Sequence, residues 1–246
     1  MGEILWDRCP ICGSKNIEEL EDEIGICGEC NHAFRLRIPG QVKPHYYQKG
    51  YWASDKNRQG ITSVAPGKEW GGWVGSRIRL LKDFGLLEHE HPERVNIFEF
   101  GCSEGMVLYE LKKRGYSVMG EDVCAIAGEA ERTLGISIDT RPIEEFEAGG
   151  HKFDLIMSFH VMEHLRDPMG VMKKLGTMLS DGGRMLLHIP MNDDEYGNPD
   201  HFHFFSDASC RKLMEAITVD IQSDFTQYAI HEGAKAQAAT YVGRKS

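Results

Sequence analysis

Thiols, imidazoles and carboxylates stand in three groups along this chain of 246 residues. Two CxxC pairs lie near the N-terminus, with fourteen residues between them. A glycine turn at 101–105 has acids on both sides. Two later stretches, 160–164 and 200–203, carry histidines beside acids. In this order, the residue types suit a metal ion, a small bound cofactor and the movement of a proton.

The cysteines have the spacing of a zinc ribbon. CxxC lets two sulfurs reach one ion, and two pairs complete the tetrahedron that Zn²⁺ prefers. A segment this short cannot build its own core, so the metal would supply its folding free energy. Two disulfides are the alternative, which a cytoplasmic chain disfavours. We therefore expect a structural zinc ribbon over residues 1–38, with the ligands Cys9, Cys12, Cys27 and Cys30.

The glycine turn follows a run of β-branched and aromatic residues, Val95–Phe100. A helical pattern restarts at Met106, and a second apolar run ends at Asp122. This order is typical of the first βαβ unit of a nucleotide-binding sheet, in which Asp122 can accept two ribose hydroxyl protons. A dehydrogenase is disfavoured because GxGxxG is absent and acids beside a pyrophosphate would cost Coulomb energy.

Strand and helix patterns alternate along the rest of the chain, which predicts an α/β fold with a Rossmann-like doubly wound sheet. The last two strands are expected to form a terminal antiparallel hairpin. Strands are expected at 95–100, 118–122, 136–139, 153–159, 184–190, 219–225 and 239–243, and helices at 76–85, 106–113, 125–133, 168–179 and 208–216.

Several motifs resemble those of a known family. The turn Glu99-x-Gly101-x-x-x-Gly105 resembles the E/D-x-G-x-x-x-G loop of class I S-adenosylmethionine (SAM) methyltransferases. FDLIMSFHVMEHLRDP, LSDGGRMLLHIP and DHFHFFS resemble successive motifs of its subgroup with ubiquinone-type O-methyltransferases and many sugar and glycan methyltransferases. Asp181 replaces the usual Pro, and Asp200 the usual Glu. The resemblance covers about residues 95–205. With the ribbon, the chain is also similar to deoxysugar C-methyltransferases, although these carry a further C-terminal domain.

The resemblance implies SAM as cofactor and assigns roles to individual residues. His164 and His201 are the candidate general bases, with Glu163 orienting either imidazole; His160 and His203 are secondary candidates. The alternative is that these histidines only shape the turn or pack. Asp139 or the backbone near Ile143 would meet the adenine amino group. The expected cofactor-binding residues are Glu99, Gly101, Cys102, Ser103, Gly105, Asp122, Val123, Asp139, Ile143 and Phe159.

The charge distribution bears on the acceptor. A net charge of −10 argues against a protein that coats nucleic acid. Residues 33–82 nevertheless carry ten Lys or Arg against two acids, which fits an anionic small acceptor or a solvated basic face. The aromatic and basic segment 39–90 is either a lid over the acceptor or a packed linker. The methyltransferase domain would then span 91–246.

Three functions are consistent with these features. The favoured one is methyl transfer to a small anionic acceptor, a sugar or glycan precursor. An RNA-base methyltransferase that grips RNA with its ribbon is the second, and a non-catalytic scaffold is the third. No apolar run is long enough to span a bilayer, and the N-terminus lacks a signal peptide, so we expect a cytoplasmic protein without a membrane partner. The oligomeric state stays open.

Overall fold

The computed structural model describes residues 2–20, 23–40, 72–191, 200–229 and 235–246. The chain divides into two compact units, one of residues 1–41 with 158–246 and the other of residues 42–157. Most of the aromatic segment that we considered as a lid, residues 41–71, lies outside the described residues. Within the described residues, no helix is both long enough and apolar enough to cross a membrane.

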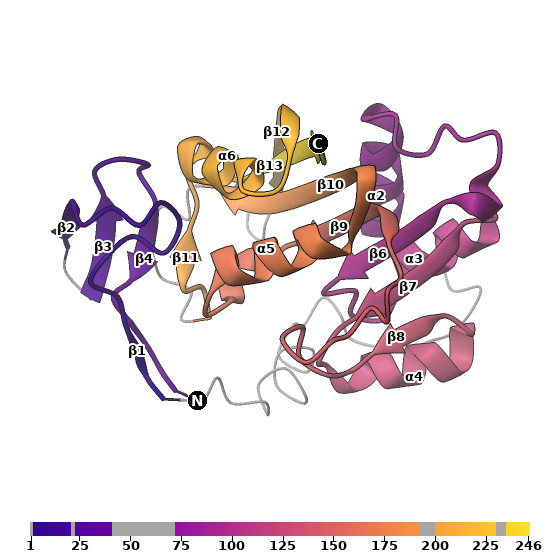
Figure 1. The fold of residues 1–246 in the computed structure, drawn as a ribbon, viewed down its shortest axis with the longest axis horizontal. Coiled ribbons are helices and arrows are strands. Elements are labelled where there is room, and N and C mark those ends of the chain that lie inside the picture. The colour runs from indigo at the N-terminus through magenta and orange to yellow at the C-terminus, as the bar shows by residue number, and fades with distance from the viewer. Residues whose placement is uncertain (1, 21–22, 41–71, 192–199, 230–234) are drawn as a thin grey trace. The chain divides into compact units, whose positions relative to one another are not determined.

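The unit of residues 42–157 contains the predicted βαβ arrangement (Figure 1). β6, β7 and β8 pair in parallel, and Glu99 lies opposite Gly120 in the register. Ile97, Phe98 and Leu111 are fully buried, as the apolar runs predict. The elements are α2 (Gly72–Asp83), η4 (Pro92–Arg94), β6 (Asn96–Phe100), α3 (Met106–Lys113), β7 (Ser117–Glu121), α4 (Ala125–Leu134) and β8 (Ser137–Asp139).

The other unit begins with residues 2–40, which we call the cysteine-rich segment. A small sheet has the strand order β11-β4-β3-β2, so that β11, from far along the chain, lies at the edge formed by β4 (Figure 1). β1 and β5 form a separate antiparallel pair. The strands are β1 (Ile4–Leu5), β2 (Ile17–Glu19), β3 (Ile24–Cys27), β4 (Ala33–Arg35), β5 (Arg37–Ile38) and β11 (His203–Phe204).

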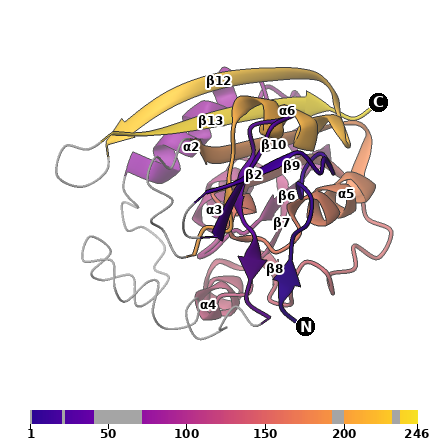
Figure 2. The same cartoon turned by 90° about the vertical axis from the view of Figure 1, so that its left-hand side faces the viewer.

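The remainder of this unit contains the predicted C-terminal hairpin. β12 and β13 run side by side and are antiparallel, and β13 also pairs with β10 (Figure 2). Within this unit the strand order is β12-β13-β10, and the boundary between the two units falls within β9 (Phe153–Phe159). The other elements are η5 (Met162–His164), α5 (Pro168–Met178), β10 (Leu179–Met191), α6 (Asp207–Glu215), β12 (Val219–Ala229) and β13 (Lys235–Arg244).

Two local expectations are corrected. The composition Ser-Asp-Gly-Gly at 180–183 predicts a turn that closes the helix 168–179, but these residues belong to β10, because the chain end extends the ladder: the Lys245 amide donates to the Gly183 carbonyl. The amphipathic pattern of the expected helix 76–85 predicts Arg77 on its outer face, but this side chain is only 24% exposed and faces Glu99. A buried carboxyl attracts this guanidinium, which overrides the amphipathic pattern.

Candidate functional site

The four cysteines of the two CxxC pairs form one cluster. Their Sγ atoms all lie within 4.8 Å of one another, with 3.6 Å between Cys9 and Cys30 and 3.5 Å between Cys12 and Cys27. A Zn–S bond of about 2.3 Å places two sulfurs of a tetrahedron about 3.8 Å apart, so the cluster has the dimensions of a four-thiolate zinc site. Backbone N–H groups of Ile11 and Glu29 point at two of the sulfurs, which favours thiolates.

The glycine turn depends on the absence of side chains. Gly105 has φ +67°, and a Cβ there would lie 2.5 Å from the Ile136 side chain. A Cβ on Gly120 would lie 2.6 Å from the sulfur of Cys102, so this thiol fills the space beside the neighbouring strand. Burial raises the pKa of Cys102, which fits an inert packed thiol. The side chains of Ile136 and Cys102 therefore leave no room for a Cβ at Gly105 or Gly120.

Asp122 ties the turn to the end of β7. Its Oδ2 accepts the Ser103 amide at 2.7 Å, and its Oδ1 accepts the Cys124 amide at 2.8 Å. The Ser103 hydroxyl donates in turn to Glu104, whose side chain is buried. Each carboxylate oxygen has two lone-pair sites, so Asp122 can shape the turn and still accept one ligand hydroxyl on each oxygen.

Glu99 is a buried carboxyl group in need of a partner. It is 1% exposed, and neither carboxylate oxygen accepts a hydrogen bond from any residue that the structure describes. Burial raises its pKa to about 8, which the Arg77 guanidinium partly opposes and the Glu104 and Asp122 carboxylates reinforce. The Arg77 Nη1 lies 3.9 Å from Oε1, beyond hydrogen-bond distance. Such a carboxyl group suits a cationic ligand group that brings its own N–H donors.

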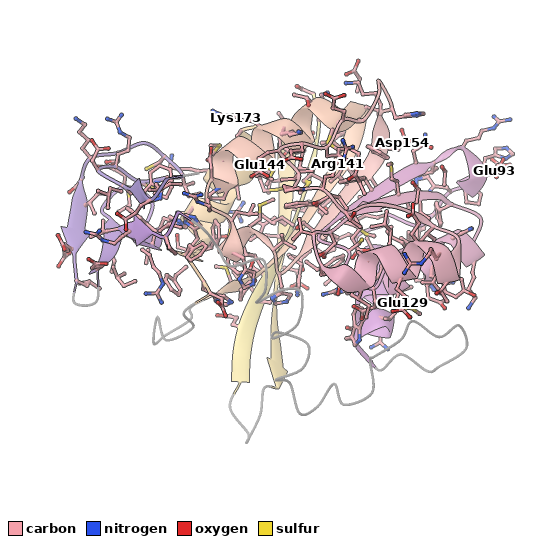
Figure 3. The ribbon with its side chains drawn as sticks, turned by 90° about the horizontal axis from the view of Figure 1, so that it is seen from below. Glu93, Glu129, Arg141, Glu144, Asp154 and Lys173 are labelled. Atoms are coloured by element: carbon pink, nitrogen blue, oxygen red, sulfur yellow. The ribbon has the colours of Figure 1, made fainter. Side chains whose placement is uncertain are left out.

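The contacts of the other expected cofactor-binding residues point less clearly to a ligand. The Asp139 carboxylate is held by Arg141, labelled in Figure 3, at 2.6 Å, and this contact lowers the pKa of Asp139. Ile143 is buried in the following turn, whereas Val123 is 43% exposed beside Asp122. The Phe159 ring is buried near the imidazole of His188, with 5.8 Å between their centroids.

The candidate catalytic side chains also come together, within the unit of residues 1–41 and 158–246. Glu163, His164 and His201 each present one ligand-type atom within 4.8 Å of the others, an arrangement that could also hold a metal ion. The His164 ring nitrogen Nδ1 lies 2.8 Å from the Asp200 carbonyl oxygen. Since a carbonyl only accepts, Nδ1 carries the proton, and the basic lone pair of the neutral ring lies on Nε2.

The secondary candidates differ from this pair. His203 is 1% exposed, its ring nitrogen Nδ1 lies 3.1 Å from Nε2 of His32, and burial lowers its pKa to about 3. It is therefore a packed neutral histidine. The His160 Nδ1 lies 3.7 Å from Oε1 of Glu163. The backbone of His160 is in the left-handed region, with φ +56°.

Sequence reasoning missed three arginines: Arg77 beside Glu99, Arg35, which donates to the His201 carbonyl, and Arg166, which follows His164 by two residues and donates to the Gly40 carbonyl. For Arg77 no sequence signal was available, because the helix pattern placed it outside. No local signal separated His201 from His203 either, since residues two positions apart in an extended segment face the same side.

Comparison with known proteins identifies the core. A family model described as a methyltransferase domain matches residues 73–223. The ubiquinone biosynthesis O-methyltransferase of Parvibaculum lavamentivorans is 30% identical over 101 residues, which is 39% of this chain and 40% of the relative. Its counterpart in Chelativorans sp. is 34% identical over the same length and share. The chain thus spans less than half the length of these curated relatives.

Solved structures share the fold. The N-methyltransferase NodS of Bradyrhizobium japonicum, in complex with S-adenosyl-L-homocysteine (SAH), superposes with a TM-score of 0.56 at 18% identity and covers 72% of this chain and 89% of its own. The magnesium protoporphyrin IX methyltransferase of Synechocystis, with bound SAM, has a TM-score of 0.56 at 16% identity, covering 84% and 100%. At these identities the likeness concerns the fold, and it confirms the Rossmann-like prediction.

Proposed function

Because this chain belongs to the SAM-dependent methyltransferase domain family, we propose that it transfers the methyl group of SAM to a hydroxyl of a small anionic acceptor, a sugar or glycan precursor. Glu99 is the observation that carries the proposal. A buried carboxyl group without donors among the described residues, beside a glycine turn, fits the ammonium group of the methionine part of SAM.

The remaining residues of the turn fit the rest of the cofactor. Asp122 would accept the two ribose hydroxyls on the lone pairs that its backbone contacts leave. The acids Glu99 and Glu104 disfavour a phosphate-bearing cofactor, since buried carboxylates repel phosphate oxygens. The adenine end would meet Ile143 and the backbone beside Asp139, because Arg141 already occupies that carboxylate.

On the acceptor side, His164 would act as general base. SAM supplies an electrophilic methyl group on a positively charged sulfur. The acceptor hydroxyl would give its proton to His164 Nε2 while its oxygen forms the bond to the methyl carbon, whose bond to sulfur would break with its electron pair going to sulfur, so that SAH leaves. Glu163, whose Oε1 lies 3.8 Å from this nitrogen, would stabilise the imidazolium that forms. His201, with its ring centroid 4.7 Å from that of His164, would orient the acceptor.

The relatives support the proposal that the methyl group goes to an oxygen atom, since the two named above are O-methyltransferases of ubiquinone biosynthesis. A single assay separates the candidate acceptors. The protein would be incubated with methyl-labelled SAM and, in separate reactions, with mixed sugar nucleotides, ubiquinone precursors and total RNA. Label in sugar nucleotides supports the proposal, and label in ubiquinone precursors corrects the acceptor class. Label only in RNA supports an RNA-base methyltransferase, and no label in any reaction supports a scaffold.

We also propose one structural Zn²⁺ at the four thiolates, since their spacing and N–H···S contacts fit it. With four protein ligands the ion would have no open position for an acceptor. It would therefore stabilise the fold of residues 1–38 and take no part in methyl transfer.

His164→Gln is expected to lower the methyl-transfer rate by roughly 10²–10⁴-fold, because glutamine keeps polarity but cannot take the acceptor proton. SAH affinity should stay within about twofold, since His164 does not belong to the residues that hold the cofactor. Initial rates and calorimetric titration measure the two quantities. His151→Gln, at an exposed position, is the matched control. Full activity of both His164→Gln and His201→Gln would rule out a histidine base.

A further inference from the structure

The backbone that carries His201 is bonded to the cysteine-rich segment. β11 pairs antiparallel with β4, which places His203 opposite Phe34 and Phe204 opposite Ala33 (Figure 1). Arg35, at the end of β4, makes two further contacts. Its amide donates to the Phe202 carbonyl at 2.9 Å, and its side-chain Nε donates to the His201 carbonyl at 3.0 Å. One arginine therefore binds two consecutive carbonyls of the candidate catalytic segment.

Buried contacts extend this junction toward the second CxxC pair. His32 and His203 are both fully buried, and their rings stack with 5.3 Å between centroids and 3.1 Å between nitrogens. The Ser206 hydroxyl donates to the Cys30 carbonyl at 2.6 Å. A buried polar contact specifies one arrangement, because losing its partner would leave an unsatisfied group. The two segments are therefore joined in one register.

The opposite side of the same segment faces the His164 turn. The Phe202 amide donates to the Glu163 carbonyl at 2.8 Å, and the Asp200 carbonyl accepts the proton of the His164 imidazole. Residues 200–203 thus lie between the cysteine-rich segment and the turn that carries Glu163 and His164. The distance between His201 and His164 depends on how these residues are held from both sides.

A second arginine holds the turn itself. Arg166 donates from Nη1 to the Gly40 carbonyl at 3.0 Å and from Nη2 to the Gly2 carbonyl at 2.5 Å. These carbonyls lie at the two ends of the cysteine-rich segment. Arg35 therefore links this segment to the strand of His201, and Arg166 links it to the turn of His164.

We propose that Arg35 is a positioning residue that sets His201 against Glu163 and His164, and that the cysteine-rich segment is the internal support of the acceptor-side histidines. Its β4 edge is already occupied by β11, so this edge does not serve an external partner. The inference deepens the proposed function, because it assigns the segment a role in the same reaction. A misplacement of about 1 Å can cost on the order of 10²-fold in rate, so a small shift of His201 is expected to matter.

Arg35→Met tests the proposal, since methionine keeps an unbranched apolar stem and the backbone donor but loses the guanidinium, which donates from Nε to the His201 carbonyl and lies over the Phe204 ring. The matched control is Arg37→Met. Arg37 lies in the same segment but pairs with exposed Glu3 and Glu23. Histidine ¹H–¹³C NMR spectra, with His201 and His164 assigned from their Gln variants, report positioning without any acceptor.

Arg35→Met is expected to move the His201 and His164 signals and to lower the methyl-transfer rate at least tenfold at unchanged KM for SAM. Arg37→Met should do neither, and Arg35→Lys should restore part of the rate. Spectra of Arg35→Met and Arg37→Met that superimpose would overturn the proposal. If Arg35→Met does not fold, Arg166→Met is the second variant, with the same two outcomes.

The test separates this inference from the proposed function. If the signals shift in Arg35→Met but His201→Gln and His164→Gln keep full activity, positioning stands and the catalytic assignment fails. If His201→Gln abolishes methyl transfer while Arg35→Met matches Arg37→Met, the catalytic assignment stands and positioning fails.

Discussion

Glu99→Gln is expected to bind SAH at least about 100-fold more weakly than the wild type, and yet to melt at a higher temperature without ligand at pH 7. SAH carries the same ammonium group as SAM, and glutamine removes its charged partner. A charge-assisted hydrogen bond to a buried carboxylate contributes about 1.5–3 kcal/mol, and two N–H donors would face this carboxyl group. Calorimetric titration and thermal unfolding measure the two effects.

The stability gain follows from the sign of the pKa shift. The folded-state pKa of Glu99 is about 8, above its ordinary value of 4.5. The group's contribution to stability is therefore fully present below pH 4.5 and is lost progressively as the pH rises from 4.5 to about 8. At pH 7 the cost is about 3 kcal/mol, at roughly 1.4 kcal/mol per pH unit, and a neutral glutamine avoids it. Glu93→Gln, at an exposed position, should change neither quantity.

The same pKa makes SAH binding depend on pH. Below pH 8 a proton must leave Glu99 before the ammonium group can bind, so the affinity should rise up to about tenfold per pH unit between pH 6 and 8. The binding enthalpy should change with the ionisation enthalpy of the buffer. In Glu99→Gln both dependences should be absent. An equal pH dependence in the variant would assign the proton to another group.

The second large effect concerns the thiolate cluster. Cys12→Ser is expected to reduce bound zinc from one ion per chain to near zero and to unfold residues 1–38. Cys12 is the least buried of the four cysteines, so the substitution itself costs little packing. Zinc binding contributes on the order of 10 kcal/mol to short ribbons, far more than their cores can replace. Elemental analysis and hydrogen exchange measure the outcome, with Cys124→Ser as the control that keeps its zinc.

Unfolding of the ribbon should affect the segment that pairs with it and leave the glycine turn intact. Residues 200–206 should exchange faster, because β11 loses its partner strand, whereas SAH binding by the glycine turn should persist. Wild-type protein that carries no zinc and holds two disulfides instead would contradict the assignment of the thiolates.

Local sequence patterns predicted the βαβ unit well, because the signals for each strand, turn and helix lie within its own residues. Val95–Phe100 is too rich in β-branched and aromatic residues for an exposed turn, and Gly105 takes a backbone conformation that a side chain would obstruct. The CxxC spacing similarly predicted one cluster, since each CxxC lets two sulfurs reach the same point, and the four sulfurs do lie within 4.8 Å of one another.

Contacts between distant segments were not predictable in this way. His32 and His203 are 171 positions apart, and nothing in either local pattern pairs them. Arg77 follows a helix pattern that assigns it to solvent, and its side chain instead faces the buried Glu99 on another element. The motifs predicted the candidate site residues, whereas the charged side chains and strands that contact them depend on tertiary packing.

The most direct test of the glycine turn as the cofactor site is calorimetric titration of SAH into the zinc-loaded protein and into Asp122→Ala. We expect saturable binding of one SAH per chain, lost in Asp122→Ala because both the ribose acceptor and the contacts to Ser103 and Cys124 disappear. Absence of binding to the folded wild type, or equal binding by the variant, would contradict the assignment of the glycine turn as the cofactor site.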